Sequence, residues 1–290
     1  MSSLTRQAGD VFEQARALSP RDLAVRLVDA FMEDKLLIWA SAIAFRAAVA
    51  VIPLTLFALG LMGFLGLSEI WTTELAPRLQ EASSVSAFMV INDTVGKVLG
   101  QGQLFWMTIG ALVTVWQVSN TVRATMHALN VVYETDEERP FLEQLWVSIA
   151  LGLAAMVALL AGVACAQGLP ALIGSILGGG GLASALGFLI GWLVALCLLG
   201  LALGLMLRAG PDKSRPPGWV SFGAVLTVAL WVLASILFGL YLTHVASYDS
   251  VFGALATAFV GLEYLYLSSV VLLAGVLVDS IVREQMEGSN

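Results

Sequence analysis

The sequence predicts an all-α protein that crosses a membrane several times. Of its 290 residues, 59% are apolar and only 12% carry a charge, which is about half the charged share of soluble domains. The charges leave long uncharged runs at 47–68, 98–122, 144–207 and 216–248. A soluble domain of this size cannot bury such runs, so they are expected to lie in a bilayer.

Composition also excludes several classes of function. The net charge of -7 argues against a nucleic-acid partner. Cys165 and Cys197 lie in apolar stretches, where cysteine is a small packing residue. His127 and His244 stand apart, and the chain has no metal-binding, phosphate-loop or nucleophile-elbow motif. We therefore expect no enzyme activity, no cofactor and no metal.

Six membrane spans are predicted, because each crossing needs roughly 20 apolar residues. Pro53 lacks an N–H and is expected to kink the first span, and the helix of the second is expected to continue to Val132. The third and fourth are separated by a break between Pro170 and the glycines at 178–181. The predicted spans are 36–67, 104–122, 145–168, 182–207, 219–242 and 251–278.

The positive charges orient these spans. Eleven of the 14 Lys and Arg residues fall on segments that are cytoplasmic if the N-terminus is inside, and two fall outside. This bias predicts that both termini are cytoplasmic.

Two segments outside the spans are predicted to form amphipathic interfacial helices. The cytoplasmic segment 1–35 has a helix start at Ser19 and Pro20. The external segment 68–103 has apolar residues at helical spacing, which favours a helical cap over the bundle rather than a substrate gate. Residues 283–290 form a short cytoplasmic tail.

Two charges lie deep inside the predicted spans, where an ionisable side chain costs at least about 2.5 to 3.5 kcal/mol. Glu263 is 12 residues from the outer start of the last span. Arg46 lies about 15 Å into the first span. We hypothesise that the two pair or face a common cavity. The alternative for Arg46 is that it extends to the cytoplasmic interface.

A polar stripe continues from the second span toward the cytoplasm. It is either the lining of an inward-facing cavity or a set of hydrogen bonds to neighbouring helices. Its residues on one helix face are Trp116, Asn120, Arg123, His127 and Asn130, and Gln117 precedes Asn120 by three residues.

Two groups of charges near the predicted cytoplasmic surface are interpreted as solvated. The acidic run at 134–138 is typical of a loop in water. Asp279 and Arg283 are four residues apart and are predicted to form a surface pair at the inner end of the last span.

Three stretches together resemble the YihY/BrkB family of bacterial inner-membrane proteins, which have been called ribonuclease BN-like. They are "ASAIAFRAAVAVIPLTLFALGLMGFLG" at 40–66, "LNVVYE" at 129–134 and "YDSVFGALATAFVGLEYLYLSSVVLLAG" at 248–275. Their order matches the family, and the resemblance covers residues 36–282. It implies a six-helix fold and a role in the bacterial envelope. The loop after "LNVVYE" is typically basic in the family but is acidic here.

The predicted function is transport or translocation of an amphipathic or anionic, lipid-like solute, along a path lined by Arg46, Glu263, Gln117, Asn120 and Arg123. The alternative is a non-transporting membrane scaffold for envelope assembly. Membrane lipids, a lipid or small-molecule substrate and a second copy of the chain are the expected partners. Ribonuclease activity is not expected, because cleavage of a polyanion needs a basic cleft.

Overall fold

The part of the chain that the structure describes consists of helices joined by short loops, such as the loop at 133–140. This structure is a computed structural model that describes residues 20–82, 85–100, 103–176, 180–212, 217–244 and 256–288. The all-α prediction is confirmed. The helices are α2 (Pro20–Glu33), α3 (Leu36–Phe64), α4 (Ser68–Ile70), the π-helix η1 (Trp71–Leu75), α5 (Ala76–Ala82), α6 (Val85–Gly100), α7 (Gln103–Val132), α8 (Phe141–Ile176), α9 (Gly181–Ala209), α10 (Pro217–His244) and α12 (Ala256–Gly288).

Several of these helices can cross a membrane. Five described helices are long and apolar enough to do so, or six if α6 and α7 together form one bent span. The helix of the second predicted span reaches Val132, and α8 continues through Pro170 to Ile176. α3 likewise continues through Pro53. The predicted helix start at Ser19 and the beginning of the last predicted span at 251 lie outside the described residues.

The spans expose most of their apolar side chains. Ile52 of α3, Leu112 of α7 and Leu160 of α8 are all strongly exposed, because lipid rather than water surrounds such helices. α12 differs, since 44% of its apolar stretch is buried against 11% for α8 and for α9. α12 is therefore the most central of the spans.

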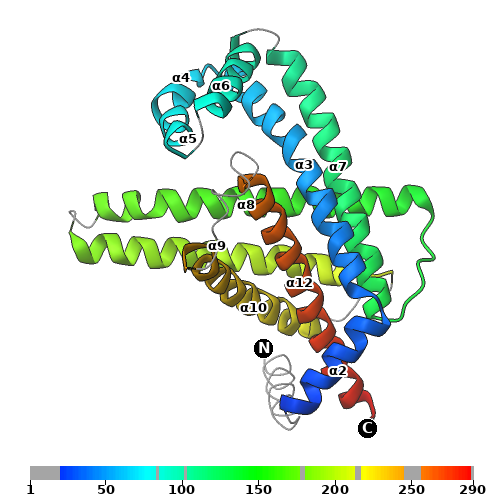
Figure 1. The fold of residues 1–290 in the computed structure, drawn as a ribbon. Helices are drawn as coiled ribbons and strands as arrows, with labels where there is room; N and C mark the ends of the chain where they lie inside the picture. The colour runs from blue at the N-terminus through cyan, green and yellow to red at the C-terminus, as the bar shows by residue number, and fades with distance from the viewer. Residues whose placement is uncertain are drawn as a thin grey trace.

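The helices form two antiparallel pairs held together at one end. Figure 1 shows α3 beside α7 and α8 beside α9, with the pairs diverging from the region where α7 leads into α8. α10 and α12 pack between them. The main core lies where the elements meet, with Leu36 of α3, Leu129 of α7, Leu207 of α9 and Leu273 of α12 buried together.

Glycines allow the paired helices to approach closely. A Cβ atom at Gly110 of α7 would lie 2.7 Å from the backbone nitrogen of Phe57 in α3. A Cβ atom at Gly187 of α9 would lie 2.6 Å from the Cα atom of Pro170 in α8. Small residues at such contacts are the usual means of packing helices in lipid, where apolar surface gains little by leaving its surroundings.

The segment between α3 and α7 packs as a helical cap over the end of α3. Its core joins Leu59 of α3 to Trp71 of η1 and to Val95 and Leu99 of α6. The indole Nε1 of Trp71 donates a hydrogen bond to Oδ1 of Asn92 at 3.0 Å. The cap therefore has its own small core, separate from the one at the opposite end of α3.

The contact at Gly110 generates a stability prediction. Gly110→Ala is expected to lower the free energy of unfolding by about 1 to 3 kcal/mol, because the added methyl group would meet backbone atoms of α3 that cannot rotate away. Thermal unfolding of the detergent-solubilised protein measures the effect. Gly239→Ala in α10 is the matched control, since its Cβ atom has no neighbour within 4 Å. Equal melting temperatures for the two variants would contradict the close contact.

Candidate functional site

A groove of roughly 450 Å³ opens between α3 and α7. It gathers most of the predicted polar stripe on one side and Arg46 on the other. We call it the cationic groove. Its lining residues are Phe45, Arg46, Val49, Gln117, Asn120, Arg123 and His127.

Hydrogen bonds in the cationic groove converge on Asn120. Nη1 of Arg46 donates to the backbone carbonyl of Asn120 at 2.8 Å, and Nη2 of Arg123 donates to its side-chain Oδ1. The Asn120 amide in turn donates to Oε1 of Gln117 at 3.2 Å. Among the described residues neither arginine takes part in an ion pair. The groove therefore presents two guanidinium groups that no described carboxylate neutralises.

Aromatic rings hold the guanidinium of Arg123 in place. Its central carbon lies 5.8 Å from the centroid of the Trp116 ring and 5.6 Å from that of Phe141. A cation within about 6 Å of a ring centroid is attracted by the negative face of the ring. Arg123 is thus positioned by α7 itself and by the first residue of α8.

A second cleft, of roughly 300 Å³, adjoins the first at His127. We call it the acidic cleft, because it is rich in carboxylates from the loop after α7. Trp39 of α3 forms part of its wall and stacks on the His127 ring with centroids 6.2 Å apart. The lining residues are Trp39, His127, Asn130, Val131, Glu134, Thr135, Asp136 and Glu137.

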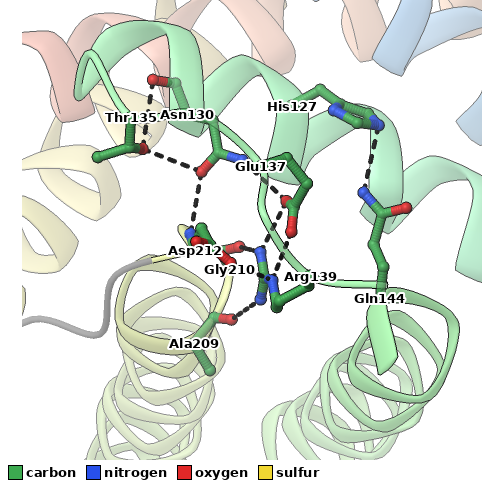
Figure 2. Close-up of polar contacts among 9 residues, drawn as sticks. All are labelled: His127, Asn130, Thr135, Glu137, Arg139, Gln144, Ala209, Gly210 and Asp212. Atoms are coloured by element: carbon green, nitrogen blue, oxygen red, sulfur yellow. Dashed lines mark hydrogen bonds and ion pairs between the residues drawn. The ribbon is translucent and has the colours of Figure 1, made fainter. Parts of the chain in front are cut away.

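Arg139 joins the loop after α7 to the end of α9 (Figure 2). Its guanidinium forms a two-point ion pair with Glu137, at 2.6 Å from Nε and 2.8 Å from Nη2, and a further ion pair with Asp212 at 3.0 Å. It also donates to the backbone carbonyls of Ala209 and Gly210 at 3.3 and 2.7 Å. These carbonyls end α9 and lack partners within the helix, so Arg139 caps it. We call this cluster the Arg139 clasp.

Asn130 extends the Arg139 clasp back to α7. Its amide nitrogen donates to Oε2 of Glu137 at 2.8 Å, and its Oδ1 accepts from the backbone N–H of Asp212 at 3.1 Å and from the Thr135 hydroxyl at 3.2 Å. Figure 2 shows Asn130 between these groups, with His127 one turn earlier on α7 and facing Gln144. Asn130 is therefore a structural link that also borders the acidic cleft.

The clasp fixes the protonation state of its charges. Burial acts to raise the pKa of Glu137, but the hydrogen bonds and charge of Arg139 and the bond from Asn130 outweigh it, so the pKa lies below the usual value. The hydrogen bond to Glu137 raises the pKa of Arg139, against the opposing effect of burial. Both groups are consequently held in their charged forms.

The structure revises two interpretations of these charges. Glu137 is not solvated as the acidic run suggested, because only 15% of its side chain is exposed and Arg139 pairs with it. The hypothesised ion pair between Arg46 and Glu263 gives way to the hydrogen bond from Arg46 to Asn120. Glu263 is half-buried on α12 and does not line the cationic groove. Depth along a helix is readable from sequence, but rotation about its axis is set by packing.

Asp279 is a buried carboxylate that sequence reasoning placed at the surface. It is 5% exposed in α12, and the Tyr133 hydroxyl donates to its Oδ2 at 3.5 Å. The side chain of Arg283, its predicted partner, lies outside the described residues. The spacing of four residues between Asp279 and Arg283 predicted a surface pair. It does not reveal that α7 and α10 cover this face of α12, because those helices are distant in the sequence.

Trp39, Arg139 and Asp212 were not selected from the sequence as site residues. Arg139 lies two residues after Glu137 and has the opposite charge, so an ion pair between these two could have been predicted. Nothing in the sequence connects Glu137 or Arg139 to Asp212. Within the described ranges, no group of three His, Cys, Asp or Glu side chains has an arrangement that could hold a metal ion.

Comparisons with known proteins place the chain among bacterial membrane proteins. The family model described as virulence factor BrkB matches residues 27–290. The ribonuclease-like protein YfkH of Bacillus subtilis (strain 168) is 23% identical over 247 residues, which are 84% of this chain and 88% of that protein. A UPF0761 membrane protein of Alkalilimnicola ehrlichii is 26% identical over 264 residues, which are 88% of this chain and 56% of the relative.

A further relative is the UPF0761 membrane protein IL2447 of Idiomarina loihiensis, which is 32% identical over 97 residues. That alignment covers 33% of this chain and 34% of the relative. No solved structure matches the chain.

Removing the cation of the Arg139 clasp should destabilise the protein strongly. Arg139→Met leaves the carboxylates of Glu137 and Asp212 buried without a counter-charge, which is expected to cost about 3 to 5 kcal/mol. Arg78→Met is the matched control, because Arg78 and its partner Glu74 are 78% and 61% exposed and such a pair contributes about 1 kcal/mol or less. Similar losses of thermal stability in the two variants would show that the clasp is not a buried interaction.

The lowered pKa of Glu137 predicts an acid limit to stability. A group with a depressed folded-state pKa contributes stability that is fully present above the unfolded pKa, here 4.5, and is lost as pH falls through the folded value. Melting temperatures measured from pH 7 to pH 3 should therefore decrease once the pH is below about 4.5. Glu137→Gln should melt lower at neutral pH and lose less on acidification. If that variant loses as much stability on acidification as the wild type, the loss is due to other carboxylates.

Proposed function

The chain belongs to the BrkB family of membrane proteins, and from that premise we propose that it translocates an amphipathic or anionic solute along the cationic groove. It is a multi-pass bacterial membrane protein. The observation that carries the proposal is the pair of guanidinium groups in this groove, Arg46 and Arg123, which have no carboxylate partner among the described residues. A cation on a span is expensive to maintain, which favours a functional role.

The surroundings of the groove suit a solute that is partly apolar. Two large side chains at the groove are exposed and would face lipid: Phe45 of α3, which lines it, and Trp116 of α7, which contacts Arg123. An amphipathic molecule could thus place its anionic group against the arginines while its apolar part stays in the bilayer. Gln117 and Asn120 supply neutral hydrogen bonds to the same group.

Ribonuclease activity is not part of this proposal. The word ribonuclease-like in the name of YfkH describes that protein alone. Here the net charge is -7, and the acidic cleft carries Glu134 and Asp136. RNA binding relies on neutralising many phosphates with basic side chains, and acidic side chains beside His127 oppose it.

The arginines of the groove should determine the rate of translocation. Arg46→Gln and Arg123→Gln are each expected to lower the flux of a fluorescent anionic phospholipid between the leaflets of proteoliposomes about tenfold, since a charge-assisted hydrogen bond contributes about 1.5 to 3 kcal/mol. Arg78→Gln is the control for loss of a positive charge, because Arg78 is exposed in the cap.

Two outcomes would contradict or redirect the proposal. Flux equal to that of protein-free vesicles for the wild type would favour the membrane scaffold instead. Full flux in both groove variants would remove the cationic groove from the path.

Glu263→Gln belongs in the same series, because the sequence placed Glu263 on the path. Loss of flux in that variant would extend the path to α12, and unchanged flux would confine it to α3 and α7.

A further inference from the structure

We propose that the two adjoining clefts together bind a zwitterionic phosphate ester of an amino alcohol, with its phosphate in the cationic groove and its ammonium group in the acidic cleft. Phosphatidylethanolamine is a membrane lipid with such a headgroup. The inference rests on the proposed function, since it names the class of amphipathic solute that the cationic groove would take.

The two clefts have opposite charge and share a wall. His127 lines both. On one side of it lie the guanidinium groups of Arg46 and Arg123, and on the other lie the carboxylates of Glu134 and Asp136. A ligand that crosses His127 therefore meets a positive potential at one end and a negative potential at the other, which is the pattern complementary to a phosphate joined to an ammonium group.

The two carboxylates that would receive the ammonium group take part in no ion pair among the described residues. Glu134 and Asp136 are exposed, and neither forms an ion pair with another described residue. Glu137 is different, because its carboxylate is bound by Arg139 and Asn130. The negative charge available to a ligand in the acidic cleft therefore comes from Glu134 and Asp136.

Trp39 adds an aromatic surface to the acidic cleft. An indole ring attracts an alkylammonium group more strongly than other aromatic side chains do. The ring is held in place by stacking on His127, and the His127 ring in turn lies 3.4 Å from the amide nitrogen of Gln144. The acidic cleft thus combines an ordered aromatic ring with two carboxylates, which is the chemistry that recognises an amine rather than a second anion.

The arrangement predicts discrimination between headgroups. An anionic phosphate ester without an amine, such as phosphatidylglycerol, would satisfy the cationic groove but leave the carboxylates unpaired and near its own charge. Repulsion between these carboxylates and the lipid's negative charge would lower the affinity for phosphatidylglycerol. The preference for the ethanolamine lipid therefore depends on Glu134 and Asp136, whereas binding of the shared phosphate depends on the arginines.

Lipid binding to the purified full-length protein in detergent, measured by native mass spectrometry with equal amounts of the two lipids, tests the inference. We expect phosphatidylethanolamine to bind about fivefold or more tightly than phosphatidylglycerol. The double variant Glu134→Gln/Asp136→Asn should lose this preference while still binding phosphatidylglycerol, which shows that it is folded. Arg123→Gln should weaken binding of both lipids. Glu138→Gln is the matched control, because Glu138 is an exposed carboxylate of the same loop that does not line the cleft.

Equal binding of the two lipids by the wild type, or an unchanged preference in the double variant, would overturn the inference. The binding assay does not measure transport. A lipid preference retained in that assay, together with no flux in the proteoliposome assay, would therefore overturn the proposed translocation alone. Glycerophosphoethanolamine, which has the headgroup without acyl chains, separates the two sources of this chemistry. Competition by this soluble ester at the same concentration as the lipid would support the headgroup site and identify a water-soluble ligand instead of a lipid.

Discussion

The ion pairs of Arg139 fix the place at which the two helix pairs of this protein meet. A single guanidinium binds Glu137 in its own loop, Asp212 beyond α9 and the two carbonyls that end α9. Because these groups are nearly buried, each would be costly without the others. The clasp therefore determines how the chain turns from α7 into α8 and where α9 ends. Asn130 transmits that geometry to α7 through its bonds to Glu137 and Asp212.

The position of the candidate site follows from this clasp. His127 lies one turn before Asn130, so fixing the end of α7 also fixes the histidine between the cationic groove and the acidic cleft. The same loop carries charges with two different tasks. Glu137 is neutralised by Arg139 and stabilises the fold, whereas Glu134 and Asp136 remain exposed and can act on a ligand. Two arginines on α3 and α7 complete a surface whose charge changes sign across one side chain.

Several features of the sequence predicted the fold directly because they depend on local properties. Uncharged runs of sufficient length must be helical in a bilayer, where no water is present to satisfy the backbone, and α3, α8, α9 and α10 follow from that rule. The stripe that contains Asn120, Arg123 and His127 was visible because helical periodicity places these residues on one face. Glu137 and Asp279 were assigned to the surface, since a charge in a loop or at a helix end is normally solvated and the covering elements are distant in sequence.

The sequence by itself determined that the chain is an all-helical, multi-pass membrane protein with a polar stripe near one end, because hydropathy and helical spacing are properties of each segment alone. The tertiary structure decided which side chains meet. Arg46 faces Asn120 of α7, and Arg139 reaches Asp212 across 73 positions of the chain. Such contacts depend on the rotation and crossing of packed helices, which are set by close approaches such as Gly110 against Phe57. Local pattern does not encode them, so the opposition of charge across His127 becomes visible only in the folded protein.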